Sequence, residues 1–207
     1  ESVSVIDANQ TERDIAASDC AFAYRDSVFK ARLAARDQAL IILGVTFRLP
    51  LRANVNLAYA ELAEAFELDA AKAGKQKRHA PAPLQVAAAV MAIRRKKLPD
   101  PGEYANAGSF FKNPVIDAST AQRLQVRSVT PYRFAQGYKV SAAQLMDLAG
   151  WKGARSGDVG CWPKQPLVLV NYGQASAEHL LGFAQEIQRS IAERFEIQLE
   201  LEPSIVS

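Results

Sequence analysis

The sequence is short of the residues that mark several common kinds of protein. Only two of its 207 residues are cysteine, Cys20 and Cys161, which is too few for a disulfide framework. We therefore expect free, buried thiols in a reducing cytosol. No run approaches ~18 consecutive apolar residues, so no membrane span is expected. No apolar segment follows Glu1 either, and this argues against a secretory signal.

Charge and histidine are also sparse. The net charge is +3, and the basic runs at 72–78 and 94–97 are not interleaved with the aromatic residues that single-strand binders use, so no nucleic-acid partner is expected. The two histidines, His79 and His179, lie far apart, and no spacing resembles a metal site. No glycine-rich phosphate-binding fingerprint follows a strand, which excludes a Rossmann or P-loop signal.

What is present is enough apolar sequence for a packed core, at 49% of residues. Val3 and Val5 alternate with serines as in a short strand, and residues 39–49 predict a long buried strand with a possible bulge at Gly44. Helical spacing or capping signals predict helices, and short apolar runs predict strands. The helices are 57–68, 84–97, 118–124, 141–149 with an N-cap at Ser141, and 176–195 with an N-cap at Ser176; the strands are 167–170 and 197–202. Helices alternating with strands indicate an α/β or α+β class, and we favour α+β.

The segment Asn106–Pro114 follows neither helical nor strand periodicity. Gly108 lets the backbone turn or approach a ligand, so Ser109 could present its hydroxyl to a pocket. Phe110 and Phe111 could exclude water there, while Lys112 and Asn113 could bind anionic or carbonyl groups. The alternative interpretation is a tight loop with a buried Phe pair.

Other candidate residues each have a structural alternative. Arg25 suits carboxylate binding but could pair with Asp26. Lys97 could meet a phosphate or be solvated, and Gln165 could offer an amide to a ligand or belong to a proline-rich turn. Glu202, at the end of the last predicted strand, is a general acid/base candidate if it is buried and otherwise an exposed carboxylate.

Four blocks of this sequence, in order, resemble the UDP-N-acetylenolpyruvoylglucosamine reductase family (MurB). Their ranges are 24–30, 97–101, 106–114 and 162–171. The resemblance implies a flavoenzyme of peptidoglycan synthesis that uses FAD and NADPH. In that family a hydride reaches C3 of the enolpyruvyl group of UDP-N-acetylglucosamine enolpyruvate, and an acid then protonates C2. A cytoplasmic monomer without metal or membrane partner is expected.

The resemblance also implies roles for individual residues. The serine acid falls on Ser109, and the arginine and glutamate that stabilise the enolate fall on Arg25 and Glu202. A shift of two residues in the last block would replace Glu202 by Glu200. The residues that contact the diphosphate and uridine fall on Tyr59, Lys97, Asn113 and Gln165, and Tyr59 indicates the subtype in which a tyrosine loop closes over substrate.

Two departures from the family pattern shape the prediction. Ser204 stands where many members have an arginine, and the glycine-rich segments that hold the FAD pyrophosphate, which precede the Arg25 block, are not present. We therefore expect a shortened chain or a fragment of a longer protein, with residues 1–98 as the tail of a flavin-binding α+β domain. Residues 99–201 would form a compact α/β substrate-binding domain, and 202–207 a terminal segment with the catalytic glutamate.

Two other functions remain open on the sequence. The chain could be a non-catalytic fragment that binds a UDP-sugar, which flavin absorbance and turnover would distinguish from an enzyme. It could also belong to a related flavin oxidase, although such enzymes often tether flavin through His or Cys, and the contexts of His79 and His179 do not favour this.

Overall fold

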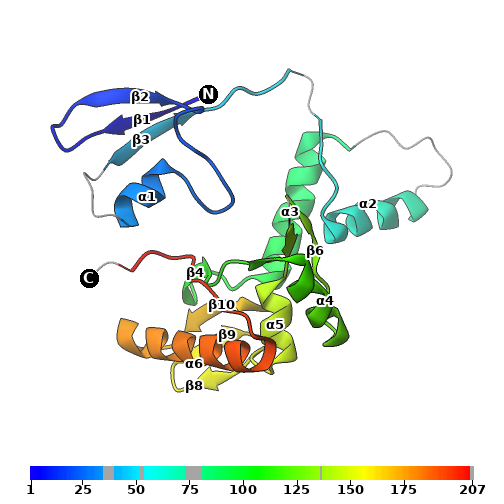
Figure 1. Cartoon of the computed structure of the whole chain (residues 1–207). Coiled ribbons are helices and arrows are strands. Elements are labelled where there is room, and N and C mark those ends of the chain that lie inside the picture. The colour runs from blue at the N-terminus through cyan, green and yellow to red at the C-terminus, as the bar shows by residue number, and fades with distance from the viewer. Residues whose placement is uncertain (35–39, 52–53, 73–80, 136, 206–207) are drawn as a thin grey trace. The chain divides into compact units, whose positions relative to one another are not determined.

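The computed structural model describes residues 1–34, 40–51, 54–72, 81–135 and 137–205. The chain divides into two compact units, Glu1–Asn54 and Val55–Ser207. The expected boundary after residue 98 stays a prediction for the domains of the parent protein. Helices and strands mix in both units, as the α+β prediction requires (Figure 1). No helix in the described ranges is long and apolar enough to cross a membrane.

The first unit is a three-stranded antiparallel sheet with one helix. Its strands are β1 (Ser2–Ile6), β2 (Glu12–Ala16) and β3 (Ile41–Thr46), in the order β2-β1-β3, and its helix is α1 (Val28–Ala34). Val3 and Val5 are buried with Cys20, which confirms the period-two prediction for β1.

The prediction of a buried strand at 39–49 is wrong about burial. In β3, Ile41, Leu43 and Val45 are each more than half exposed. The strand lies at the edge of the sheet, where only β1 pairs with it. An apolar run shows that a strand can be buried, but it does not show that another element packs over it. The register shifts so that Leu43 is the extra residue, which places a bulge beside Gly44, near the predicted position.

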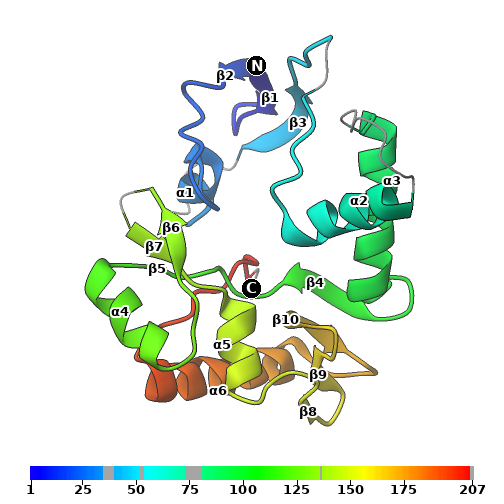
Figure 2. The same ribbon diagram turned by 90° about the vertical axis from the view of Figure 1, so that its right-hand side faces the viewer.

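The second unit is built around a four-stranded antiparallel sheet, in the order β4-β10-β9-β8. Its strands are β4 (Ala105–Ser109), β8 (Arg155–Ser156), β9 (Val159–Trp162) and β10 (Gln165–Asn171). Helices α5 (Ala142–Leu148) and α6 (Ala177–Phe195) contact each other and pack on β10 and β9 (Figures 1 and 2). The predicted caps are confirmed: Ser141 and Ser176 accept hydrogen bonds from backbone N–H groups in the first turns of α5 and α6.

The core of this unit matches the helical periodicity of α6. Phe183, Ile187, Ile191 and Phe195 are buried, and Leu180 packs against them partly buried. Beyond α6, Ile197 and Leu199 are buried while Gln198 and Glu200 are exposed, as the predicted alternation requires. The C-terminal segment forms one bridge, from Leu201 to Phe111, rather than the full strand predicted over 197–202.

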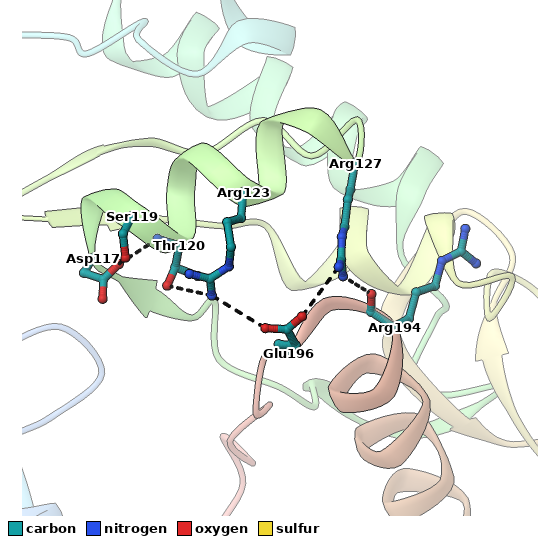
Figure 3. Close-up of polar contacts among 7 residues, drawn as sticks. All are labelled: Asp117, Ser119, Thr120, Arg123, Arg127, Arg194 and Glu196. Carbon is teal, nitrogen blue, oxygen red and sulfur yellow. Dashed lines mark hydrogen bonds and ion pairs between the residues drawn. The ribbon is translucent and has the colours of Figure 1, made fainter.

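The sequence predicts a helix at 118–124 but not the small sheet beside it. Strands β5 (Val115–Ile116), β6 (Tyr132–Phe134) and β7 (Gly137–Lys139) pair in the order β5-β7-β6, beside α4 (Ala118–Val126). Polar contacts join α4 to the end of α6 (Figure 3). Arg127 donates to the carbonyl of Arg194 at 2.5 Å, and the Glu196 carboxylate accepts from Arg127 and pairs with Arg123. Glu196 has a φ of 59°, the left-handed cap that ends α6 and redirects the chain.

Two helices precede this sheet in the chain. They are α2 (Ala60–Lys72) and α3 (Pro83–Lys97), close to the predicted 57–68 and 84–97. No residue of α3 is buried: Val86 and Ile93 are half-buried and Val90 is exposed. Most of the expected loop between these helices lies outside the described residues.

Candidate functional site

Ser109 is the last residue of β4, opposite Val168 of β10. The register between these strands shifts just before it, so β4 carries a bulge around Gly108. The φ of Gly108 is 72°, which a residue with a Cβ adopts only with strain. The Asn106 side chain accepts from the Gly108 N–H at 3.0 Å and so holds the bend. Gly108 therefore uses the conformational freedom that the sequence analysis expected, but within a bulged strand rather than a turn or loop, and Ser109 is half-buried.

Phe110 and Phe111 are both buried, with an edge-to-face geometry and 5.6 Å between ring centroids. The Phe110 N–H donates to the carbonyl of Leu167, which ties the pair to β10. The burial of this pair was common to both interpretations of the segment, so it does not distinguish them. The pair places two buried apolar side chains at the positions that follow Ser109 in the sequence.

The C-terminal segment brings Glu202 next to this strand. The Glu202 N–H donates to the Phe110 carbonyl at 3.0 Å, and the Lys112 N–H donates to the Glu200 carbonyl at 2.9 Å. Residues 110–112 and 200–202 therefore pair antiparallel, and Glu202 lies beside the residue that follows Ser109. Glu202 is half-buried as a residue.

Glu200, the alternative to Glu202, has different surroundings. Its side chain is 74% exposed, and its carboxylate pairs with Lys112 Nζ at 3.0 Å. A solvated carboxylate that already has a cation is poorly suited to a protected proton-transfer site. The two glutamates thus differ in exposure, and the assignment of the catalytic role to Glu202 stays a prediction.

Arg25 lies in the first unit, so its approach to Ser109 and Glu202 stays a prediction. It occupies a turn closed by backbone hydrogen bonds between Ala23 and Asp26. Its φ is 55°, an uncommon conformation for a residue that is not glycine. The Asp26 carboxylate accepts from the Ser27 N–H at 2.8 Å.

Lys97 and Tyr59 are brought together. Lys97 is the last residue of α3, and its ammonium pairs with the carboxylate of Glu61 in α2. The hydrogen bond to Glu61 raises the pKa of Lys97, with a smaller contribution from Tyr59. Tyr59 immediately precedes α2 and is 59% exposed. A cation and a phenol thus share one surface.

Gln165 begins β10, directly across a two-residue turn from Trp162. Its Oε1 is buried and has no hydrogen-bond partner among the described residues. Leaving such an acceptor unpaired costs about 1–3 kcal/mol, so the position favours a ligand or water that donates to it. The predicted proline-containing turn is also present, at residues 163–164. A turn and an amide that is open to a ligand therefore occur in the same segment.

Asn113 has a structural role that sequence reasoning missed. Its Oδ1 accepts from the Ala142 N–H at 2.9 Å, at the first residue of α5. It therefore supplements the Ser141 cap. No local pattern indicates this contact, because the two residues meet only in the folded domain.

The sequence also missed Glu61, the partner of Lys97, and Trp162, whose indole Nε1 donates to the Lys97 carbonyl at 2.9 Å. Both lie within two or three residues of a predicted site residue, but only the fold pairs them with Lys97. The two cysteines are free and buried as predicted, and burial raises the pKa of the Cys161 thiol to about 12. The described residues hold no group of three potential metal ligands, and His79 lies outside them.

Comparison with known proteins places the chain in a family. Residues 100–206 match the family profile "UDP-N-acetylenolpyruvoylglucosamine reductase, C-terminal domain". A protein named UDP-N-acetylenolpyruvoylglucosamine reductase from Pseudomonas savastanoi is 43% identical over 208 residues, with 99% of this chain and 58% of that protein covered. One of the same name from Ralstonia nicotianae is 45% identical over 193 residues, with 92% and 54% covered.

A solved structure is similar in fold. It is that of UDP-N-acetylenolpyruvylglucosamine reductase (MurB) from Thermus caldophilus, with a TM-score of 0.51 and 22% identity over 99% of this chain and 52% of that one. The chain thus spans little more than half the length of the relatives that it matches. Since a matching profile covers over half of its residues, the chain belongs to the UDP-N-acetylenolpyruvoylglucosamine reductase family.

Proposed function

We propose that the parent protein reduces UDP-N-acetylglucosamine enolpyruvate to UDP-N-acetylmuramate for peptidoglycan synthesis in the cytoplasm, using FAD and NADPH. This chain would supply the substrate-binding residues and the proton donor. The observation that supports the proposal is the pairing of residues 110–112 with 200–202, which sets the Glu202 backbone beside Phe110, the residue after Ser109. Family membership supplies the reaction.

The first unit offers little to hold the pyrophosphate of the flavin. Gly44 is the one glycine in the sequence of the first unit, and it lies in a strand, so this unit contains no glycine-rich turn to hold a pyrophosphate. The flavin site of the parent protein would therefore require residues beyond this chain. The steps below concern only what this chain's own residues do to the substrate.

Ser109 would give its hydroxyl proton to C2 of the enolpyruvyl group. A serine hydroxyl is a very weak acid, so it protonates carbon only if the intermediate is strongly basic and water is kept away. The buried rings of Phe110 and Phe111 supply apolar surface beside it. Glu202 is half-buried, and its backbone N–H pairs with the carbonyl of Phe110. Its carboxylate would act with Ser109.

Arg25 would stabilise the negative charge of the enolate intermediate. Preorganised donors of this kind typically contribute ~3 kcal/mol to transition-state stabilisation. The positive φ of Arg25 supports the assignment, because strained backbone conformations of this kind cluster at functional sites.

Tyr59, Lys97, Asn113 and Gln165 would bind the diphosphate and uridine. Lys97 carries a raised pKa and is therefore a fixed cation at neutral pH, and Glu61 would yield it to a phosphate. Gln165 has an unsatisfied buried carbonyl that suits a donor on the ligand. For Asn113, the oxygen is engaged by α5, so the amide nitrogen is the group to meet the substrate.

The decisive experiment is Ser109→Ala in the full-length parent protein. Flavin reduction by NADPH should proceed normally in stopped-flow measurements, while turnover of substrate should fall by ~10²–10⁴-fold because the proton donor is lost. Ser119→Ala is the matched control, since Ser119 is exposed and its hydroxyl donates to Asp117 at the start of α4. Turnover of Ser109→Ala near that of the control would refute the assignment.

A second candidate is a module that binds a UDP-sugar without chemistry. It is compatible with the placement of all four proposed substrate-binding residues in the second unit. Purified full-length parent protein that is colourless but binds UDP-N-acetylglucosamine would support the module. Full-length parent protein that carries bound flavin and turns over substrate would support the enzyme.

A further inference from the structure

Trp162 stands between two of the residues proposed to bind substrate. Its indole Nε1 donates to the Lys97 carbonyl at 2.9 Å. It is also the direct cross-strand partner of Gln165 in the β9–β10 hairpin. Side chains of opposite residues in an antiparallel pair start about 5 Å apart, so the indole and the Gln165 amide are neighbours. The indole thus contacts the Lys97 backbone and belongs to the cross-strand neighbour of Gln165.

The hydrogen bond from Trp162 falls on a carbonyl that α3 cannot satisfy. The helix ends at Lys97, and the next N–H, that of Leu98, donates to Arg94. The last carbonyls of a helix have no partner within it and need one from outside. The indole therefore acts as a cap on the residue that carries the ammonium.

This cap matters because α3 is weakly packed. None of its residues is buried, so apolar contacts do little to fix its position. The salt bridge between Lys97 and Glu61 is about one-third exposed on each side, and such pairs hold geometry loosely. The half-buried indole adds a direct hydrogen bond to the Lys97 backbone.

The ring itself is fixed by an aromatic cluster, defined as Tyr104, Trp162 and Tyr172. Tyr104 lies 5.4 Å from Trp162 and 5.6 Å from Tyr172 between ring centroids. The Arg155 guanidinium stacks over Tyr172 at 3.8 Å. The cluster draws on β9, the residue before β4 and the residue after β10, so it is built into the sheet.

We propose that Trp162 is a positioning residue for diphosphate binding, which fixes the backbone that carries the Lys97 ammonium. The inference rests on the proposed function, since it requires that Lys97 binds the UDP-sugar. Trp162 does not itself touch the phosphates. It acts through its hydrogen bond to the Lys97 carbonyl.

The test measures binding of two probes to the 207-residue chain by calorimetry, UDP-N-acetylglucosamine and the phosphate-free nucleoside uridine. Trp162→Phe removes the indole N–H and should weaken the affinity for the UDP-sugar by about tenfold. The Lys97 carbonyl loses its donor, and the Lys97 backbone is then no longer held in position. Uridine affinity should not change. A variant with 3-benzothienylalanine at position 162, which keeps the ring shape but lacks the N–H, guards against a Phe variant that does not fold.

The second tryptophan of the chain provides a matched control. The Trp151 indole donates to Ser190 Oγ at 3.1 Å and packs edge-to-face on Phe183, so Trp151→Phe also loses one indole hydrogen bond within the same unit. It should lower the melting temperature and leave both affinities unchanged. A merely structural role for Trp162 would give the same result as this control.

A double-mutant cycle with Lys97→Met tests whether Trp162 acts through Lys97. In that background Trp162→Phe should have little further effect on UDP-sugar binding. Fully additive losses, equal losses for uridine and the UDP-sugar, or wild-type affinity in Trp162→Phe would each overturn the positioning role while leaving the proposed function standing. Failure of the unmodified chain to bind UDP-N-acetylglucosamine would overturn the substrate site as well.

Discussion

Strands β3 and β10 are both runs of large aliphatic residues, but their surroundings differ. β10 has a strand on each side and two helices packed near it, and Leu167–Val170 are buried. β3 pairs only with β1, and Ile41, Leu43 and Val45 are more than half exposed. The first unit buries Val3, Val5 and Cys20, whereas the second has an extended core. Burial thus follows from the elements available to cover a strand, beyond the strand's own sequence.

The largest expected difference between the two units concerns core truncation. Ile187 of α6 is fully buried, so Ile187→Ala should lower the free energy of unfolding by about 2–5 kcal/mol through lost contacts and a cavity. Leu43→Ala in β3 should change it by no more than about 0.5 kcal/mol, because the side chain is already solvated. Urea titrations followed by circular dichroism would measure both. An equal cost for the two variants would mean that β3 is covered in solution.

A smaller difference is expected for serines that cap or do not cap a helix. Ser176 accepts from the His179 N–H at the start of α6, so Ser176→Ala should cost ~1 kcal/mol. Ser18 in the first unit contacts only the neighbouring Asp19 carboxylate, and Ser18→Ala should be close to neutral. Thermal unfolding of the two variants provides the comparison. A neutral Ser176→Ala would show that packing alone fixes the start of α6.

The smallest difference concerns one ion pair in each unit. The Lys97–Glu61 pair is about one-third exposed, whereas Arg48 in the Arg48–Glu1 pair is 81% exposed. Glu61→Gln should cost at most about 1 kcal/mol, and Arg48→Gln less.

The Lys97–Glu61 effect should also depend on pH. Because the pKa of Lys97 is raised in the folded chain, its contribution is complete below the unfolded value of about 10.4 and is lost as the pH rises through the higher folded value. Unfolding titrations of wild type and Glu61→Gln at neutral pH and above that range measure this. A difference that persists at the higher pH would assign the effect to packing instead.

Local patterns predicted the parts of the fold that local forces decide. The apolar stripe of α6 and its Ser176 cap, and the alternation of Val3 and Val5, depend on residues close in sequence. β4 could not be predicted from its sequence, because alanine, asparagine and glycine have low strand propensity and its formation depends on pairing with β10. The exposure of β3 likewise depends on what lies around it.

The candidate site also has residues that the sequence indicated and contacts that only the fold reveals. Motif resemblance indicated Ser109, Lys97, Gln165 and Glu202, and their roles stay predictions. The contacts that support them, Glu61 and Trp162 with Lys97, join residues distant in the sequence and follow only from the fold. The second role of Asn113, as a helix cap, has the same origin.

The short antiparallel pairing near the C-terminus has a consequence for how this family can vary. Neighbouring side chains on paired extended chain point in opposite directions, so a slip of one residue would turn the Glu202 carboxylate away and present Leu201 in its place. With the proposed role of Glu202, the number of residues between Phe195 and Glu202 should be under tighter constraint than the identity of the exposed ones, such as Gln198. Single insertions or deletions in this stretch should then abolish function in a protein that still folds, whereas many substitutions there should have little effect.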